Sequence, residues 1–107
     1  MRHIEESDWR HLRDLKPVLL DRYCRKVLAE FEKIVSAHDD PAHPRYLAMY
    51  ELIHDRDRAL GDMFNDLRRS NAIFAIFLLR RNGVFTEDEF EGFGDETKRE
   101  IALLPGR

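Results

Sequence analysis

Apolar residues recur every three or four positions over most of the chain, the spacing of one face of an α-helix. Between residues 17 and 36 this face consists of Leu20, Cys24, Val27, Phe31 and Ile34. The pattern predicts a helix over about 17–36. Pro17 follows a short helix over about 9–16 and is expected to restart or kink the helix, because proline has no amide hydrogen and disfavours helical geometry in the residue before it. Ser7 or Asp8 is expected to cap the short helix.

The same spacing predicts a much longer second helix, over about 44–82. Its apolar side shows an unbroken alternation of three and four: Tyr46, Tyr50, Ile53, Asp57, Leu60, Phe64, Leu67, Asn71, Phe74 and Leu78. A loop rich in proline and aspartate precedes this helix and turns the chain back. Gly61 is its weak point, since glycine destabilises a helix interior by about 1 kcal/mol relative to alanine. We expect the helix to continue through Gly61, because the pattern stays in phase.

The clearest boundary signals lie near the end of this long segment. Two arginines followed by Asn82-Gly83 are typical of a helix C-terminus. Thr86 and Glu89 have the spacing of a capping box, and the flanking phenylalanines that of a hydrophobic staple. These signals predict short helices over about 87–93 and 96–104, with Asp95 as the cap of the last one.

The predicted fold class is therefore all-α. A chain of 107 residues is expected to form one domain, residues 1–107. Its centre is predicted to be an antiparallel helical hairpin in which 17–36 packs against the first half of 44–82. The short helices flank this hairpin at both ends.

The unequal lengths of the two hairpin helices indicate a homo-oligomer. At 1.5 Å per residue, helix 17–36 is about 30 Å long and helix 44–82 about 58 Å, so their shared span ends near Phe64. Beyond that point lies the most apolar part of the chain, which a soluble monomer rarely exposes. We expect a second copy to cover it, giving a dimer; the alternative is that the long helix bends at Gly61 and packs its second half inside one chain. The predicted interface consists of Leu67, Asn71, Ile73, Phe74, Ile76, Phe77 and Leu78.

Two polar residues, Asp57 and Asn71, interrupt the apolar side of the long helix. A polar group at such a position fixes register or partner choice at some cost in stability. The alternative is that the helix rotates slightly and both residues stay in water. In a parallel pair two copies of Asp57 would meet, and the pKa of one carboxyl would rise because two adjacent carboxylates resist joint ionisation. We therefore expect that the long helices do not pair in parallel.

Charge makes nucleic-acid binding the weakest of three functional hypotheses. The formal net charge is -3, and residues 84–107 hold three basic and seven acidic residues. The Asn82-Gly83 turn between helices has a loose helix-turn-helix outline, but the helix after it begins with carboxylates, which repel phosphates. The remaining basic candidates are Arg68, Arg69, Arg80 and Arg81. The two pairs are 12 residues apart, which turns them about 120° around a helix.

Composition also bears on location. The longest apolar run, residues 72–79, is far shorter than the roughly 20 residues of a membrane span. No apolar segment follows the first residues, and Cys24 is the single cysteine. We expect a cytoplasmic protein with no membrane association. The excess of 14 Arg over 4 Lys favours a GC-rich bacterial genome.

One spacing resembles enzyme chemistry. Glu51 and His54 are three positions apart on a helix, as in the carboxylate–histidine pairs that hold metal in di-iron bundles. Asp55 and Arg58 lie nearby at spacings equally typical of an exposed face of ion pairs. A metal-dependent bundle enzyme is therefore the alternative, although no catalytic residue, metal or cofactor is expected. The preferred hypothesis is a small non-enzymatic helical protein that acts by self-association or by binding a partner helix.

Overall fold

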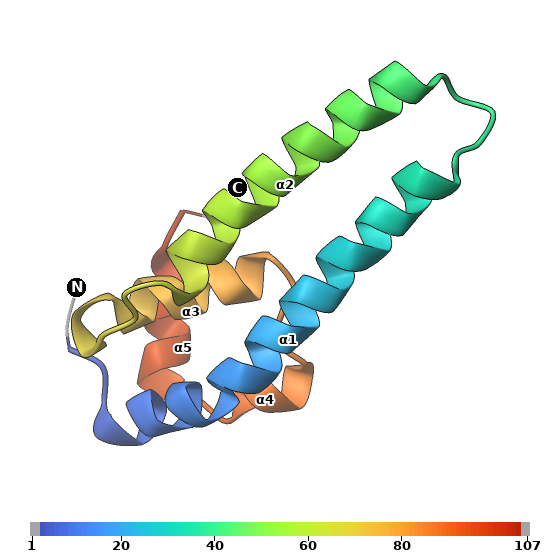
Figure 1. The fold of residues 1–107 in the computed structure, drawn as a ribbon. Coiled ribbons are helices and arrows are strands. Elements are labelled where there is room, and N and C mark those ends of the chain that lie inside the picture. The colour runs from blue at the N-terminus through green and yellow to red at the C-terminus, as the bar shows by residue number, and fades with distance from the viewer. Residues whose placement is uncertain (1–2, 106–107) are drawn as a thin grey trace.

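The computed structural model describes residues 3–105, and the predicted single domain of 1–107 extends two residues beyond that range at each end. Helices account for all regular structure in the described range, which confirms the all-α prediction. The elements are α1 (Glu6–Ser36), α2 (Ala42–Phe64), the one-turn 3-10 helix η1 (Arg69–Asn71), α3 (Ala72–Arg81), α4 (Glu87–Glu91) and α5 (Asp95–Leu103). As predicted, α1 and α2 form an antiparallel hairpin (Figure 1).

The predicted restart at Pro17 is wrong, because α1 is one continuous helix through that residue, and the predicted kink is the alternative that agrees with the structure. Proline costs a helix one hydrogen bond and favours a bend there. Burial on both sides of Pro17 outweighs this cost, since Leu12 and Leu19 are 1% and 0% exposed. Figure 1 shows α1 changing direction in its first half. The predicted helices 9–16 and 17–36 are therefore one element.

The predicted helix 44–82 is also wrong, because α2 ends at Phe64. The break lies beyond Gly61, at Asp66, whose φ of 54° is left-handed and stops the helix. The Asn71 side chain stabilises the turn that follows. It accepts a hydrogen bond from the Arg68 amide and donates one to the Asp66 carbonyl oxygen, both at 2.9 Å. Asn71 is thus a turn residue and does not set helix register.

After this turn α3 folds back and packs beside the end of α2 and beside α5 (Figure 1). This removes the length mismatch on which the predicted dimer depended. The apolar segment 72–79, apart from the exposed Phe74, is largely buried by the chain's own helices. The core that it joins consists mainly of Trp9, Leu12, Leu19, Met63, Phe64, Ile73, Ile76, Leu79, Val84, Phe90, Phe93 and Ile101.

The corner between α3 and α4 is confirmed in detail. Gly83 takes the left-handed conformation that ends α3, with a φ of 68°. The Glu89 amide donates to Thr86 Oγ1 at 3.1 Å, and the Thr86 amide donates to Glu89 Oε1 at 2.9 Å, so the capping box is complete. The Phe85 and Phe90 rings pack 5.9 Å apart as the staple. α4 ends at Glu91, two residues earlier than predicted.

Glu89 also ties this corner to α1. The Arg22 guanidinium forms two hydrogen bonds with its carboxylate, at 2.6 and 3.0 Å, and a third with the Val84 carbonyl oxygen at 2.8 Å. The hydrogen bond from Arg22 is the main cause that lowers the pKa of Glu89. His11 Nε2 donates to the Glu89 carbonyl oxygen at 2.7 Å. One residue thus caps α4 and anchors it to the hairpin.

Asp8 has a different role from the predicted one. Its own helix begins after Glu5 without a side-chain cap, and Asp8 is 3% exposed. Its carboxylate accepts from the Gly94 amide at 2.9 Å and from Thr97 Oγ1 at 2.6 Å, at the N-terminus of α5. An anion there is stabilised by the free amides and the helix dipole. Asp8 therefore performs the capping role predicted for Asp95, which is instead the first residue of α5.

We predict that Asn71→Ala lowers the free energy of unfolding by about 1–2 kcal/mol, because two hydrogen bonds of the turn are lost. Ser70→Ala, at an exposed neighbouring position, is the control and should change it by less than about 0.5 kcal/mol. Urea unfolding measures both. An unchanged midpoint for Asn71→Ala would show that this side chain does not hold the turn.

We predict that Glu89→Gln destabilises the protein by about 2 kcal/mol at neutral pH, since a charge-assisted pair is lost. The folded-state pKa of Glu89 lies below its ordinary value of 4.5. The stabilisation is therefore present above pH 4.5 and lost as the pH falls through the folded value. Urea titrations at several pH values should show wild type and variant converging in acid. Glu87→Gln, whose side chain is 77% exposed, is the control, and a gap for Glu89→Gln that does not narrow as the pH falls below 4.5 would contradict the assignment.

Candidate association surface

The outer halves of α1 and α2 form an arm that projects from the rest of the molecule (Figure 1). We define the arm as residues 24–57 and call the other described residues the base. The radius of gyration is 16.3 Å, against about 13 Å for a compact chain of this length. The accessible surface is 7277 Å², against about 6,300 Å² for a compact protein of 12.8 kDa. The extended shape therefore leaves about 1,000 Å² of additional surface in water.

Polar contacts join the two helices of the arm on one side. The Arg56 guanidinium donates two hydrogen bonds to the Glu30 carboxylate, at 3.0 and 2.8 Å, and mainly through them lowers the pKa of Glu30. The Tyr23 hydroxyl donates to the Arg56 carbonyl oxygen at 3.1 Å. Near the tip, Arg45 Nε donates to the Ile34 carbonyl oxygen at 3.1 Å. The Ile34 carbonyl oxygen also accepts from the Ala37 amide at 3.3 Å, so this last contact adds a second donor at the end of α1.

The other side of the arm is apolar. A hollow of about 200 Å³ follows the α1–α2 seam there, lined by Tyr23, Cys24, Val27, Leu28, Phe31, Ile53, Arg56, Asp57 and Leu60. Residues seven positions apart return to nearly the same side of a helix, which adds Val35 beyond Leu28 and Tyr46 beyond Ile53. We define the apolar face as Cys24, Leu28, Phe31, Val35, Tyr46, Tyr50, Ile53 and Leu60.

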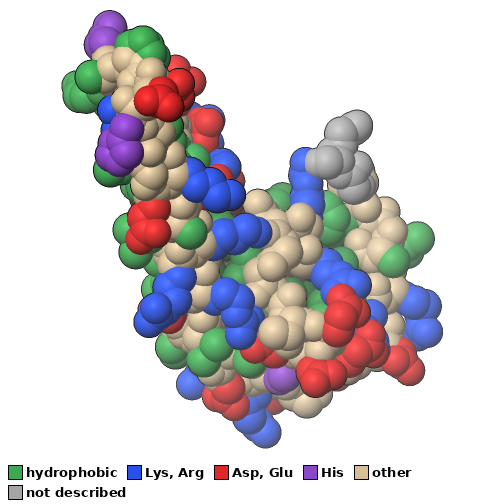
Figure 2. Space-filling model, turned by 90° about the vertical axis from the view of Figure 1, so that its right-hand side faces the viewer, with side chains coloured by type: hydrophobic (Ala, Val, Ile, Leu, Met, Phe, Trp, Pro, Cys, Tyr) green, Lys and Arg blue, Asp and Glu red, His purple; other side chains and the backbone are tan. Residues whose placement is uncertain are grey.

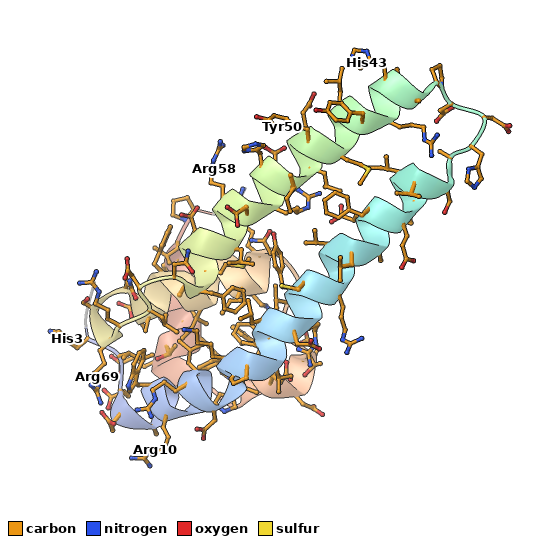
Figure 3. The ribbon with its side chains drawn as sticks, in the orientation of Figure 1. His3, Arg10, His43, Tyr50, Arg58 and Arg69 are labelled. Atoms are coloured by element: carbon orange, nitrogen blue, oxygen red, sulfur yellow. The ribbon has the colours of Figure 1, made fainter. Side chains whose placement is uncertain are left out.

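Much of this face is in water. Nine large apolar side chains are exposed in the described part of the chain, and six of these lie on the arm. Five belong to the apolar face: Leu28 (59%), Val35 (50%), Tyr46 (67%), Tyr50 (58%) and Ile53 (45%). Hydrophobic side chains follow the left edge of the arm in Figure 2, and Figure 3 shows Tyr50 pointing outward from α2. Single exposed apolar residues are ordinary, whereas a contiguous group marks an interaction surface.

Asp57 is the one carboxylate that borders the hollow. Asp57 is exposed, so in the single chain its carboxylate stays in water. This agrees with the alternative stated for this residue in the sequence analysis. Cys24 is a free, half-buried thiol on the same seam. The predicted place of both residues on the apolar side of their helices agrees with the lining of the hollow.

The predicted interface does not form a surface in this fold. Ile73, Ile76 and Phe77 are 1%, 0% and 8% exposed, because α3 turns them into the core. Phe74 is 46% exposed and is the one member of that set on the outside. Leu67 and Leu78 are half-buried against the core. A second copy therefore cannot reach most of these side chains without unfolding the base.

The candidate metal ligands Glu51 and His54 both lie exposed on α2. The His54 ring packs against the Tyr50 ring, with centroids 4.3 Å apart. Within residues 3–105 no group of three or more His, Cys, Asp or Glu side chains is placed to hold a metal ion. The pair is therefore not completed to a binding site by the described part of the chain.

Two of the basic candidates have structural contacts. Arg69 pairs with Glu6 at 3.1 Å and lies over the Trp9 ring, 5.4 Å from its centroid. Arg80 pairs with Glu87 at 2.9 Å and lies 4.1 Å from the Phe90 ring centroid. Their guanidinium groups are engaged with acidic and aromatic neighbours, which does not favour a shared phosphate-binding patch.

The association surface was not identified from the sequence, although its residues were visible there. Tyr46, Tyr50 and Ile53 belong to the three–four alternation, but the alternation was assigned to packing inside the hairpin. Leu28 and Val35 broaden the stripe of α1, and that breadth is the available signal. A helix that packs on a single neighbour needs only a narrow apolar stripe, so the additional width indicates a second contact.

No family model matches this chain, and neither a curated protein nor a solved structure matches it. None of the helices in the described range combines the length and apolar character of a membrane span. Most of the exposed large apolar side chains in the described range lie on the arm.

We predict that Phe77→Glu destabilises the protein by at least about 3 kcal/mol, because it places a carboxylate in the core. Phe74→Glu, on the exposed side of the same helix, is the matched control and should cost less than about 1 kcal/mol. Urea unfolding separates the two. A Phe77→Glu variant that stays equally stable would show that α3 does not pack as described.

Proposed function

We propose that this is a small non-enzymatic helical protein that acts by taking up helices of another chain on the apolar face of its arm. One observation carries the proposal: five large apolar side chains, each 45% exposed or more, share one side of a two-helix arm. Two helices bury only the stripes with which they face each other. Further helices on the same side would bury the second stripe and complete a four-helix bundle.

The size of the surface fits this role. A stable interface buries about 800 Å² on each partner. The extended shape leaves about 1,000 Å² more in water than a compact chain of this mass would. Tyr46 and Tyr50 add the amphipathic aromatic side chains in which binding surfaces are enriched. The excess counts the whole surface of the chain, including the polar side of the arm, and it exceeds one half-interface, so shape and composition both support association.

We also propose the cytoplasm of a bacterium as the location. The composition supports this through the single cysteine and the ratio of 14 Arg to 4 Lys. Charged residues make up 36% of the chain, which supports a protein that works in water.

Photo-crosslinking in cells tests the proposed function. We predict that a photoreactive phenylalanine derivative in place of Tyr50 forms covalent adducts with another polypeptide chain, which can be the same or a different protein. The same derivative in place of Asp55, an exposed residue on the opposite side of α2, is the control and should form few. Equal yields at the two positions, or none at Tyr50, would contradict the proposal.

A further inference from the structure

The chemistry around the apolar face indicates which helices it takes up. A two-fold interface must be self-complementary: if one residue of the first copy contacts a second residue of the other copy, the reverse contact between the same two positions also forms. In an antiparallel pairing, complementary groups must therefore lie at equal distances on either side of the axis. Both helices of the arm show such pairs.

On α1 the pair is Arg25 and Glu32. They are seven residues apart on the exposed side, and Leu28 lies between them. In the single chain Arg25 bonds to Asp21 at 2.7 Å, but both side chains are more than 60% exposed. An ion pair as exposed as this contributes little, so Arg25 is available to another carboxylate. An axis beside Leu28 would bring Arg25 of each copy opposite Glu32 of the other.

On α2 the pair is Tyr50 and Asp57. They are also seven residues apart, with Ile53 between them, and both are exposed. A phenol hydroxyl donates readily to a carboxylate, and such a charge-assisted bond is stronger than a neutral one. An axis beside Ile53 would bring Tyr50 of each copy opposite Asp57 of the other. The carboxylate that interrupts the apolar side would then have a donor.

The two centres lie side by side across the seam, because Leu28 of α1 and Ile53 of α2 line the same hollow. A single axis across the arm therefore satisfies both helices. From Leu28 there are eight residues to the end of α1 at Ser36, and from Ile53 there are eleven to the start of α2. The base begins five residues from each centre, at Tyr23 and Arg58. Each tip therefore extends past the partner's arm and along the first turns of its base.

We infer that the partner is a second copy of this chain, with the two arms packed antiparallel about an axis at Leu28 and Ile53. This inference rests on the proposed function. The result is a four-helix bundle in which the two apolar faces cover each other. Arms pointing the same way about a two-fold axis would set α2 against α1. Asp57 would then lie level with Cys24 and Leu28 of the other copy, where no donor meets its carboxylate, and burial without a donor is costly.

Cysteine pairing in purified protein tests the geometry, in a Cys24→Ser background. Ile53→Cys should form a covalent dimer under mild oxidation, because the axis brings the two copies of this residue together. A mixture of Tyr50→Cys and Asp57→Cys chains should cross-link to each other. Asp57→Cys alone is the control, because its two copies would be about 10 Å apart along the bundle, beyond the roughly 7 Å that a disulfide spans.

Exchanging the charges at Arg25 and Glu32 gives a second test of the pairing. Arg25→Glu should weaken the dimer about tenfold, and adding Glu32→Arg should restore it, because the double variant is self-complementary again. Two outcomes would overturn the antiparallel pairing. One is that Asp57→Cys alone cross-links as fast as the mixture, and the other is that the double variant forms a weaker dimer than Arg25→Glu does. If no purified variant cross-links while Tyr50 adducts in cells contain a different protein, the second copy is wrong and the proposed function stands. If Tyr50 forms no adducts either, both fail.

Discussion

Burial of the apolar segment 72–79 within its own chain is the constraint on which the rest of the structure depends. The left-handed residue Asp66 and the Asn71 side chain turn the chain back, so that α3 packs beside α2 and α5. Its buried side chains join the same core as Leu12 and Leu19 of α1. The outer half of the hairpin receives no cover, because α3, α4 and α5 are all committed to the base (Figure 1).

The two parts are held together by different means. In the base, polar contacts between distant segments reinforce the core. Asp8 accepts hydrogen bonds at the N-terminus of α5, and Arg22 donates to the Glu89 carboxylate at the start of α4. In the arm, two helices share one narrow seam with the Glu30–Arg56 pair beside it. Helices that bury so little gain much from additional packing, since most helix stability comes from tertiary burial. The base is therefore the scaffold and the arm is the part that a partner would stabilise.

Sequence reasoning predicted what local signals determine. The helical class, the hairpin and the capped corner at Thr86 and Glu89 all follow from spacing and short-range chemistry. It failed where tertiary packing outweighs local preference, at Pro17, and where a periodic pattern continues through a turn. Leu67 and Phe74 keep the phase of α2 although the helix has ended, and the turn-forming residues between them were the available warning. The interface was misplaced for that reason, because it was inferred from a helix length that the fold does not have.

The central claim is that a second copy of this chain covers the apolar face of the arm and leaves the base free. Hydrogen exchange of the purified protein over a range of concentrations tests it most directly, because amide protection reports local opening and dimer formation rises with concentration. The account predicts that protection of residues 24–57 increases with protein concentration, while that of the base core stays constant. Arm protection that is the same at every concentration, or that changes together with the base, would contradict it.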